Sequence, residues 1–208
     1  MQEQQKLKTG TTTVGIKCKD CVIVAAESKS TMGSLIASKT AEKVFKIDDR
    51  IAVTIAGGSG DAQNVIRILR AEINLYKLSR NKQMTVNAVT SLLSNVLQGN
   101  RYYPYMAMLI VGGYDETGGH VYSTDPVGGL EEDDFTSTGS GSPMAYGVLE
   151  NEYKPGLTKE EGIRLAARAI RSAKERDIYS GGYNINIAVI DKSGITMVDQ
   201  EKVRELVK

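Results

Sequence analysis

Residues 10–27 read GTTTVGIKCKDCVIVAAE, and this stretch sets the start of the fold. Threonine, valine and isoleucine favour extended backbone because their branched side chains pack well on a pleated surface. The stretch therefore predicts two short strands, over residues 12–17 and 21–27, which are joined at Lys19 and Asp20.

The spacing of apolar residues predicts the elements further along the chain. Val65, Leu69 and Ile73 recur at helical spacing after Asp61, which this pattern makes the N-cap of a first helix. A second helix follows Thr85, its expected cap. The other predicted helices cover residues 143–153, 158–176 and 199–208, and Thr158 and Glu161 have the spacing of a capping box. The other predicted strands are 43–47, 51–56, 105–113, 119–124, 134–137, 185–189 and 194–198.

Helices and strands thus come in blocks: strands, two helices, strands, two helices, strands. We expect 119–124 and 134–137 to be neighbours of 105–113, and 194–198 to pair with 185–189. Block order argues against a doubly wound parallel sheet and favours an α+β fold with layered sheets. Since no repeat or low-complexity linker divides the chain, we expect one domain.

Composition limits the function classes. The chain has 26 basic and 25 acidic residues, so no net charge draws it toward nucleic acid or an anionic membrane. Residues 1–10 are polar and lack the apolar run of a signal peptide. Two cysteines make no disulfide framework, which favours a reducing compartment. We therefore expect a cytoplasmic protein with no nucleic-acid or membrane partner.

Thr11 is the first candidate for chemistry. A threonine hydroxyl is a poor nucleophile unless a base lies beside it, and a threonine at a chain N-terminus can use its own α-amine. That amine has a pKa of about 7.7–8, so it is partly a free base near neutrality. Cleavage after Gly10 would create such an end, and glycine lets the preceding peptide bond bend toward the hydroxyl. The alternative is that the threonines only belong to a strand.

Longer motifs extend this candidate along the chain. After the opening stretch come VAAESKSTMG at 24–33, SKTAEKVF at 38–45, TIAGGSGDAQ at 54–63, TSTGSGSPMAYGVLE at 136–150 and SAKERDIYSGG at 172–182. In this order and spacing, the chain resembles the catalytic β subunits of proteasomes, especially the archaeal type. The resemblance implies an N-terminal nucleophile hydrolase fold, a four-layer αββα sandwich of two antiparallel sheets between helix layers. It also implies that residues 1–10 are an autocleaved propeptide and that 11–208 form the catalytic domain.

The resemblance implies roles for single residues. Thr11 matches the nucleophile, Lys43 the buried ammonium that tunes its proton chemistry, and Glu27 the partner of Lys43, where many members carry aspartate. Gly57 matches the backbone donor to the oxyanion. A polar set that supports the amine and a nearby water is matched by Ser140, Asp177 and Ser180. The alternatives are a solvated surface pair for Lys43 and Glu27, and turn or helix-end roles for the rest.

The same resemblance implies a pocket for the residue that precedes the cut. Its expected lining is Ser30, Thr31, Ala41, Ile55, Ser59 and Gln63. None of these side chains is charged, so the pocket is expected to favour large apolar residues.

As partners, the resemblance implies proteasome α subunits, other β subunits in stacked seven-membered rings, an ATP-dependent unfoldase acting through the α ring, and unfolded protein substrates. Two further hypotheses are an inactive β subunit that only builds the ring wall and a small-substrate amidohydrolase on the same fold. The bacterial ATP-dependent threonine peptidase is similar at its N-terminus. Loss of Thr11, Lys43 or Gly57 would favour the inactive subunit, yet all three are present.

No cofactor or metal is expected. Cys18 and Cys21 have redox spacing, but they lie between two strands rather than at the start of a helix, so we interpret them as core or hairpin residues. His120 is the only histidine, and zinc needs about four ligands, so we interpret His120 as structural.

Overall fold

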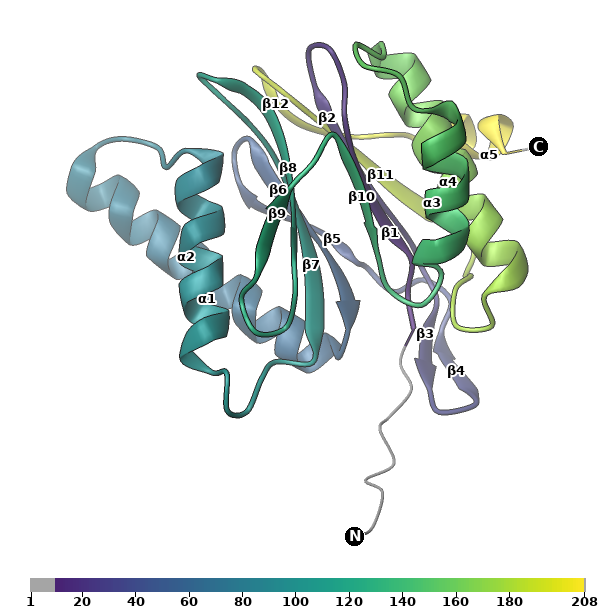
Figure 1. Ribbon diagram of the computed structural model, residues 1–208, viewed down its shortest axis with the longest axis horizontal. Helices are drawn as coiled ribbons and strands as arrows, with labels where there is room; N and C mark the ends of the chain where they lie inside the picture. The colour runs from purple at the N-terminus through teal and green to yellow at the C-terminus, as the bar shows by residue number, and fades with distance from the viewer. Residues whose placement is uncertain (1–9, 208) are drawn as a thin grey trace, which may run out of the picture.

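The computed structural model describes residues 10–207, and within them two five-stranded antiparallel sheets stack face to face (Figure 1). The first sheet has the order β10-β1-β2-β11-β12 and the second β5-β6-β7-β8-β9. The first contains β1 (Thr13–Lys17), β2 (Val22–Glu27), β10 (Phe135–Thr138), β11 (Ile185–Asp191) and β12 (Gly194–Met197). The second contains β5 (Val44–Asp48), β6 (Ile51–Gly57), β7 (Ala107–Asp115), β8 (Gly118–Thr124) and β9 (Leu130–Glu132).

Helices cover the outer face of each sheet, so the chain has the predicted four layers (Figure 1). The helices α1 (Ser59–Arg80) and α2 (Val86–Gly99) pack on the second sheet. On the other side, α3 (Ser142–Glu152), α4 (Lys159–Arg176) and the short α5 (Gln200–Leu206) cover the first sheet. A separate hairpin of β3 (Ser30–Met32) and β4 (Leu35–Ser38) projects from one end of the sandwich.

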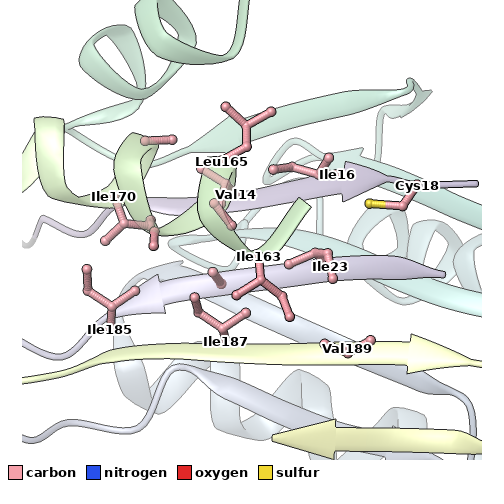
Figure 2. Close-up of a cluster of buried hydrophobic side chains, with 14 of the residues drawn as sticks. Val14, Ile16, Cys18, Ile23, Ile163, Leu165, Ile170, Ile185, Ile187 and Val189 are labelled. Atoms are coloured by element: carbon pink, nitrogen blue, oxygen red, sulfur yellow. The ribbon is translucent and has the colours of Figure 1, made fainter. Parts of the chain in front are cut away.

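Alternation along the strands explains the layers. In β1 and β2, Val14, Ile16, Ile23 and Ala25 face α4, as Figure 2 shows for several of them. The intervening residues of β2 face the second sheet instead, where they meet apolar residues of β5 to β8. Since successive side chains of a strand point to opposite faces, a strand with two apolar faces has to lie between two layers.

Two glycines allow the sheets to approach each other. A Cβ on Gly15 would lie 2.7 Å from Val121, and one on Gly112 would lie 2.4 Å from Val24. Both distances are too short for real carbon contacts. A side chain at either position would therefore push the sheets apart.

The local signals at helix starts are confirmed in two places. The Thr85 hydroxyl accepts a hydrogen bond from Ala88 N, and Thr158 and Glu161 form both bonds of a capping box. Asp61 is not an N-cap, because α1 begins two residues earlier, after Gly58. Its carboxylate instead accepts a hydrogen bond from Met106 N at 2.8 Å, which ties the helix to the start of β7.

One predicted strand neighbour is wrong. Residues 135–138 form β10, which pairs with β1 in the first sheet and is not in the sheet that contains β7. A hydrogen bond of 2.7 Å joins the hydroxyls of Thr13 and Thr138 across that pairing. The expected pairing of β11 with β12 is confirmed, whereas β3, β4 and β9 were not predicted.

Candidate active site

Thr11 lies two residues before the start of β1, in a buried position with 4% of its surface exposed. Its hydroxyl donates a hydrogen bond of 2.7 Å to the carbonyl oxygen of Gly10 and accepts one of 2.8 Å from Lys43 Nζ. The predicted nucleophile thus has a cationic donor on one side and the peptide bond after Gly10 on the other.

Lys43 reaches Thr11 from the segment that leads into β5. Ala41 N donates to Ser28 O at 2.8 Å and Ile55 N donates to Lys43 O at 3.0 Å, so this segment is held against both β2 and β6. The ammonium donates to three acceptors: Thr11 Oγ1, Glu27 Oε1 and the carbonyl oxygen of Lys29. These three bonds use every N–H of an ammonium group.

Glu27 is the last residue of β2, and its surface is fully buried. The predicted ion pair with Lys43 is formed. The second carboxylate oxygen accepts hydrogen bonds from Lys29 N at 2.6 Å and Gly181 N at 3.0 Å. A buried charge is tolerated when it is paired and hydrogen-bonded in this way. We call Thr11, Glu27 and Lys43 the buried triad.

Burial lowers the pKa of the Lys43 ammonium, and the attraction of Glu27 offsets this only in part. A lysine in this state is a stronger acid than one in water, while its charge still favours loss of the proton from a neighbouring hydroxyl. The buried triad can therefore stabilise negative charge on Thr11 Oγ1.

Gly57 ends β6 beside Thr11, with a φ of 116° that favours glycine. A Cβ at this position would lie 2.3 Å from Met106 O, so no other residue fits there without a shift of the backbone. Gly57, Thr11 and Lys43 border the same cavity, of about 80 Å³. A backbone N–H from such a position can meet an oxyanion that forms in the cavity.

The polar set predicted near Thr11 forms one connected network. Asp177 Oδ2 accepts hydrogen bonds of 2.6 Å from both Ser140 Oγ and Ser180 Oγ. Since a carboxylate only accepts, the 2.6 Å bond between Thr12 and Ser180 has the Thr12 hydroxyl as its donor. Ser140 Oγ also lies 3.4 Å from Thr11 O. The network thus joins the C-terminal end of α4 to the backbone of Thr11.

Five of the six predicted pocket residues line the cavity next to Thr11. They are Ser30, Thr31, Ala41, Ile55 and Ser59. Gln63 does not line it, because it is exposed in the second turn of α1. Glu42 lines the cavity but was not predicted, so the lining is not free of charge.

Lys174 was not among the predicted site residues, yet it supports Glu27 through a loop. Its ammonium donates to Gly182 O at 3.0 Å and thereby holds the loop whose Gly181 N–H bonds Glu27. Burial lowers the pKa of Lys174, and Glu27 opposes that shift. A lysine in the last turn of a helix is common, so Lys174 carries no local signal of this role, and its partner comes from the loop that follows α4.

Cys18 and Cys21 are buried and free, as the core interpretation requires. The hydrogen bond with Cys21 and burial raise the pKa of the Cys18 thiol. Within residues 10–207, no group of histidine, cysteine and acidic residues is arranged to hold a metal ion. In the same part of the chain, no helix is both long and apolar enough to cross a membrane.

His120 belongs to a polar cluster around the turn between β7 and β8. Its Nδ1 lies 2.7 Å from Glu132 Oε1, and its Nε2 lies 2.7 Å from the hydroxyl of Thr117. Asp115 and Tyr122 complete the cluster, since Asp115 Oδ1 accepts from Thr117 Oγ1 at 2.6 Å and Tyr122 donates to Glu132 at 2.8 Å. We call these five residues the surface clasp, because they fasten β9 to the β7–β8 hairpin.

Comparison with known proteins adds a family to this geometry. The family model described as "Proteasome subunit" matches residues 7–190. "Proteasome subunit beta" of Methanococcus vannielii is 53% identical over 201 residues, which cover 96% of this chain and 91% of that protein. The proteins of the same description from Methanosarcina barkeri and Methanoregula boonei are 48% and 51% identical over 205 residues. Those alignments cover 98% of this chain and 97% and 96% of the relatives.

Proposed function

This chain belongs to the proteasome subunit family, and from that premise we propose that Thr11 is the nucleophile by which it cuts peptide bonds, once the residues before it are removed. As a β subunit of the proteasome core it is a threonine-type endopeptidase, and it assembles with α subunits. One observation carries the proposal: the Lys43 ammonium donates to Thr11 Oγ1 in a buried site that borders a cavity.

The first reaction is self-processing. Thr11 Oγ1 attacks the carbonyl carbon of Gly10, the Gly10–Thr11 amide becomes an ester, and water hydrolyses that ester. The products are a carboxylate at Gly10 and a free α-amine on Thr11. The hydroxyl already contacts the Gly10 carbonyl, at 2.7 Å from its oxygen. The residues removed, 1–10, form the proposed propeptide, of which all but Gly10 lie outside the described residues.

Only glycine fits at position 10, because neighbouring side chains leave no room for a Cβ. A Cβ on Gly10 would lie 1.9 Å from the Cβ of Tyr179 and 2.5 Å from Ser140 Oγ. Any larger residue would displace the carbonyl from the Thr11 hydroxyl or push Tyr179 away from the site. The close approach of Tyr179 and Ser140 to Gly10 therefore holds the Gly10–Thr11 peptide bond in place for attack.

The second reaction is proteolysis. The free amine takes the proton of Thr11 Oγ1 as the oxygen attacks a substrate carbonyl, and the Lys43 charge stabilises the developing negative charge. The oxyanion accepts a hydrogen bond from Gly57 N, a kind of contact that typically lowers the barrier by about 3–4 kcal/mol. The amine then passes the proton to the leaving peptide, and water hydrolyses the remaining ester.

Asp177, Ser140 and Ser180 hold the amine and a water in this scheme. Their network already reaches Thr11 through Ser140 and Thr12. The pocket that receives the side chain before the cut has Ala41 and Ile55 as apolar walls, which supports cleavage after large apolar residues. Burying such a side chain contributes about 1.5–3 kcal/mol.

The proposal extends to the assembly. Stacked seven-membered β rings would lie between α rings in the cytoplasm, and an ATP-dependent unfoldase would feed unfolded proteins through the α ring. The inactive-subunit hypothesis finds no support, because Thr11, Lys43 and Gly57 all border one cavity.

Intact mass spectrometry of the chain, expressed together with its α subunit, tests the proposal. The wild-type chain should begin at Thr11, and Thr11→Ala should keep residues 1–10 and lack peptidase activity. Thr11→Ser, which retains a hydroxyl, should still process itself. An active wild-type enzyme that keeps its leader would disprove the scheme, because its Thr11 nitrogen would be an amide rather than a base.

A further inference from the structure

The end of the first hairpin holds two thiols that the proposed chemistry leaves unused. Strands β1 and β2 pair with Lys17 opposite Val22, and Cys18 N donates to Cys21 O at 2.8 Å, which continues this register. Cys18 and Cys21 therefore lie opposite each other, and both belong to the core between the first sheet and α4. Cys18 Sγ lies against that helix, where a Cβ on Gly162 would come within 2.4 Å of it. Both cysteines are free, and they are the only two in the chain.

The backbone of such an opposed pair suits a disulfide. Residues that face each other in an antiparallel pair have Cα atoms about 4.5–5.5 Å apart. A disulfide joins residues whose Cα atoms are about 4.4–6.8 Å apart. The two side chains share a hydrogen bond, so the sulfur atoms already meet. A bond between them would close a loop that contains only Lys19 and Asp20, which are both exposed. The disulfide therefore fits the hairpin without a change in strand register.

The surroundings of the two sulfur atoms differ. The hydrogen bond from the Cys18 thiol lowers the pKa of Cys21, and the charge of Lys159 at the start of α4 lowers it further. Burial and the charges of Asp191 and Asp20 oppose this shift. The same hydrogen bond and burial raise the pKa of the Cys18 thiol. One thiol of the pair thus ionises before the other, which is the arrangement of an attacking and a resolving cysteine.

We propose that Cys18 and Cys21 are a redox site that a peroxide converts into a reversible disulfide. The Cys21 thiolate attacks one oxygen of the peroxide and the O–O bond breaks. The products are a sulfenic acid on Cys21 and a hydroxide, which becomes water with the proton that Cys21 had released. The Cys18 sulfur then attacks the Cys21 sulfur, the S–S bond forms, and the hydroxyl leaves as water with the Cys18 proton. The two thiols lose two electrons, and hydrogen peroxide is reduced to two waters.

The second thiol makes the oxidation reversible. A sulfenic acid without a neighbouring thiol is oxidised further to a sulfinic acid, which ordinary thiols do not reduce. A disulfide is reduced again by thiol–disulfide exchange. Cys18 and Cys21 are only 6% and 3% exposed, so peroxide reaches them when the hairpin end opens locally. The inference is independent of the role proposed for Thr11, which lies at the opposite end of β1.

The test uses assembled particles that are reduced, freed of reductant and treated with hydrogen peroxide. After quenching, the protein is denatured and alkylated with N-ethylmaleimide, and the mass of the intact chain is measured. The untreated chain should carry an adduct on each of its two cysteines. The treated chain should carry none and should have lost two hydrogens, and dithiothreitol should restore both adducts.

Single variants assign the two roles. Cys18→Ser should stop at a sulfenic acid on Cys21, which dimedone traps, and longer treatment should convert it to a sulfinic acid. Cys21→Ser should form the corresponding dimedone adduct at least about threefold more slowly, because its remaining thiol is more fully protonated. If serine prevents assembly, Cys18→Ala and Cys21→Ala offer the same comparison with an apolar side chain.

Three results would overturn the inference. The first is a treated wild-type chain that keeps both maleimide adducts while glutathione in the same solution is fully oxidised, since the cysteines would then only fill the core. The second is a wild-type chain that passes to sulfinic acid without a disulfide. The third is a product with the mass of two joined chains, because the bond would then lie between chains and not across the hairpin.

Discussion

The buried triad and the surface clasp contain similar groups in similar contact. In the triad, Thr11 Oγ1 lies 2.8 Å from the nitrogen of Lys43, which is paired with Glu27. In the clasp, Thr117 Oγ1 lies 2.7 Å from a nitrogen of His120, whose other nitrogen lies 2.7 Å from Glu132. Each is a hydroxyl, a basic group and a carboxylate in a row.

Their surroundings separate them. Thr11 and Glu27 are 4% and 0% exposed, and the hydroxyl borders a cavity. Thr117 is exposed in a turn, and Asp115 already holds its hydroxyl. Burial keeps water from screening the Lys43 charge, so this charge acts fully on the neighbouring oxygen. The same kinds of groups in contact therefore hold strands together at the surface, and they form a reactive site only where they are buried beside a cavity.

The largest expected difference comes from removing each basic group. Lys43→Ala should lower peptidase turnover by about 10²–10⁴-fold, because Thr11 loses the charge that stabilises its alkoxide. His120→Ala should leave turnover unchanged. Lys43→Arg should not restore activity, since arginine is larger and does not give up its proton. Turnover would be measured on assembled particles whose processing is checked by mass, and near-normal turnover in processed Lys43→Ala would contradict the role.

Two glycines, one beside each cluster, separate backbone strain from the position of Thr11. Gly139 and Gly118 have φ values of 96° and 116°, so alanine strains the backbone at both. A Cβ on Gly139 would lie 2.0 Å from Thr11 O, whereas one on Gly118, at the clasp, would meet nothing within 4 Å. Gly118→Ala should cost only about 1–2 kcal/mol of stability. Gly139→Ala should in addition displace Thr11 and lower turnover about 10²-fold.

Thermal unfolding and peptide hydrolysis of the two glycine variants provide the check. Equal losses of activity in both would mean that strain alone, and not the position of Thr11, controls turnover.

Two aspartates test the hydrogen-bond networks at a smaller scale. Asp177→Asn should lower turnover about tenfold, because Oδ2 accepts from Ser140 and Ser180 while Oδ1 accepts from Tyr179 N, and an amide has only one accepting oxygen and no charge. In the surface clasp, Asp115 Oδ2 accepts a hydrogen bond from Val86 N at 2.9 Å. Asp115→Asn should weaken the clasp and lower only stability. The measurement is kcat/KM beside melting temperature for each variant. A larger loss of kcat/KM in Asp115→Asn than in Asp177→Asn would reverse the assignment of the two networks.

The smallest expected effect is an acid response of the clasp. Burial alone would raise the pKa of Glu132, but its hydrogen bonds with His120 and Tyr122 hold that pKa below the usual range. A lowered folded-state pKa stabilises the fold above the ordinary carboxyl pKa of about 4.3, and this stability is lost as pH falls through the folded value.

Glu132→Gln should therefore flatten the fall in melting temperature between about pH 6 and pH 3. The Glu132 side chain is 44% exposed, so the effect should stay below about 1 kcal/mol. Identical pH profiles for wild type and Glu132→Gln would show that the clasp does not contribute to acid sensitivity.

Local signals in the sequence predicted local structure correctly. The caps at Thr85 and Thr158 depend on residues three positions apart, so their partners are close in sequence as well as in space. The first hairpin is similar, since β1 and β2 are joined by a short turn and both alternate between apolar faces. The order of elements in blocks predicted the layered α+β class. The motifs that resemble a known family led to Thr11, Lys43 and Glu27.

Contacts between distant segments could not be predicted in this way, because they depend on how the whole chain folds. The partner of β10 is β1, more than a hundred residues earlier, and nothing near residues 135–138 signals it. The hairpin of β3 and β4 was missed because its apolar residues are exposed and a register shift between Ser30 and Thr31 breaks the alternation.

Glu42 follows Ala41 and precedes Lys43, and alternation along an extended chain would direct its side chain away from both. The residue nevertheless borders the same cavity, because the fold brings all three positions beside Thr11. Local elements could be predicted from the residues alone, because propensity and capping act over a few residues. The reactive arrangement was decided by the fold, since Thr11 and Lys43, 32 residues apart, meet only when β5 and β2 belong to stacked sheets.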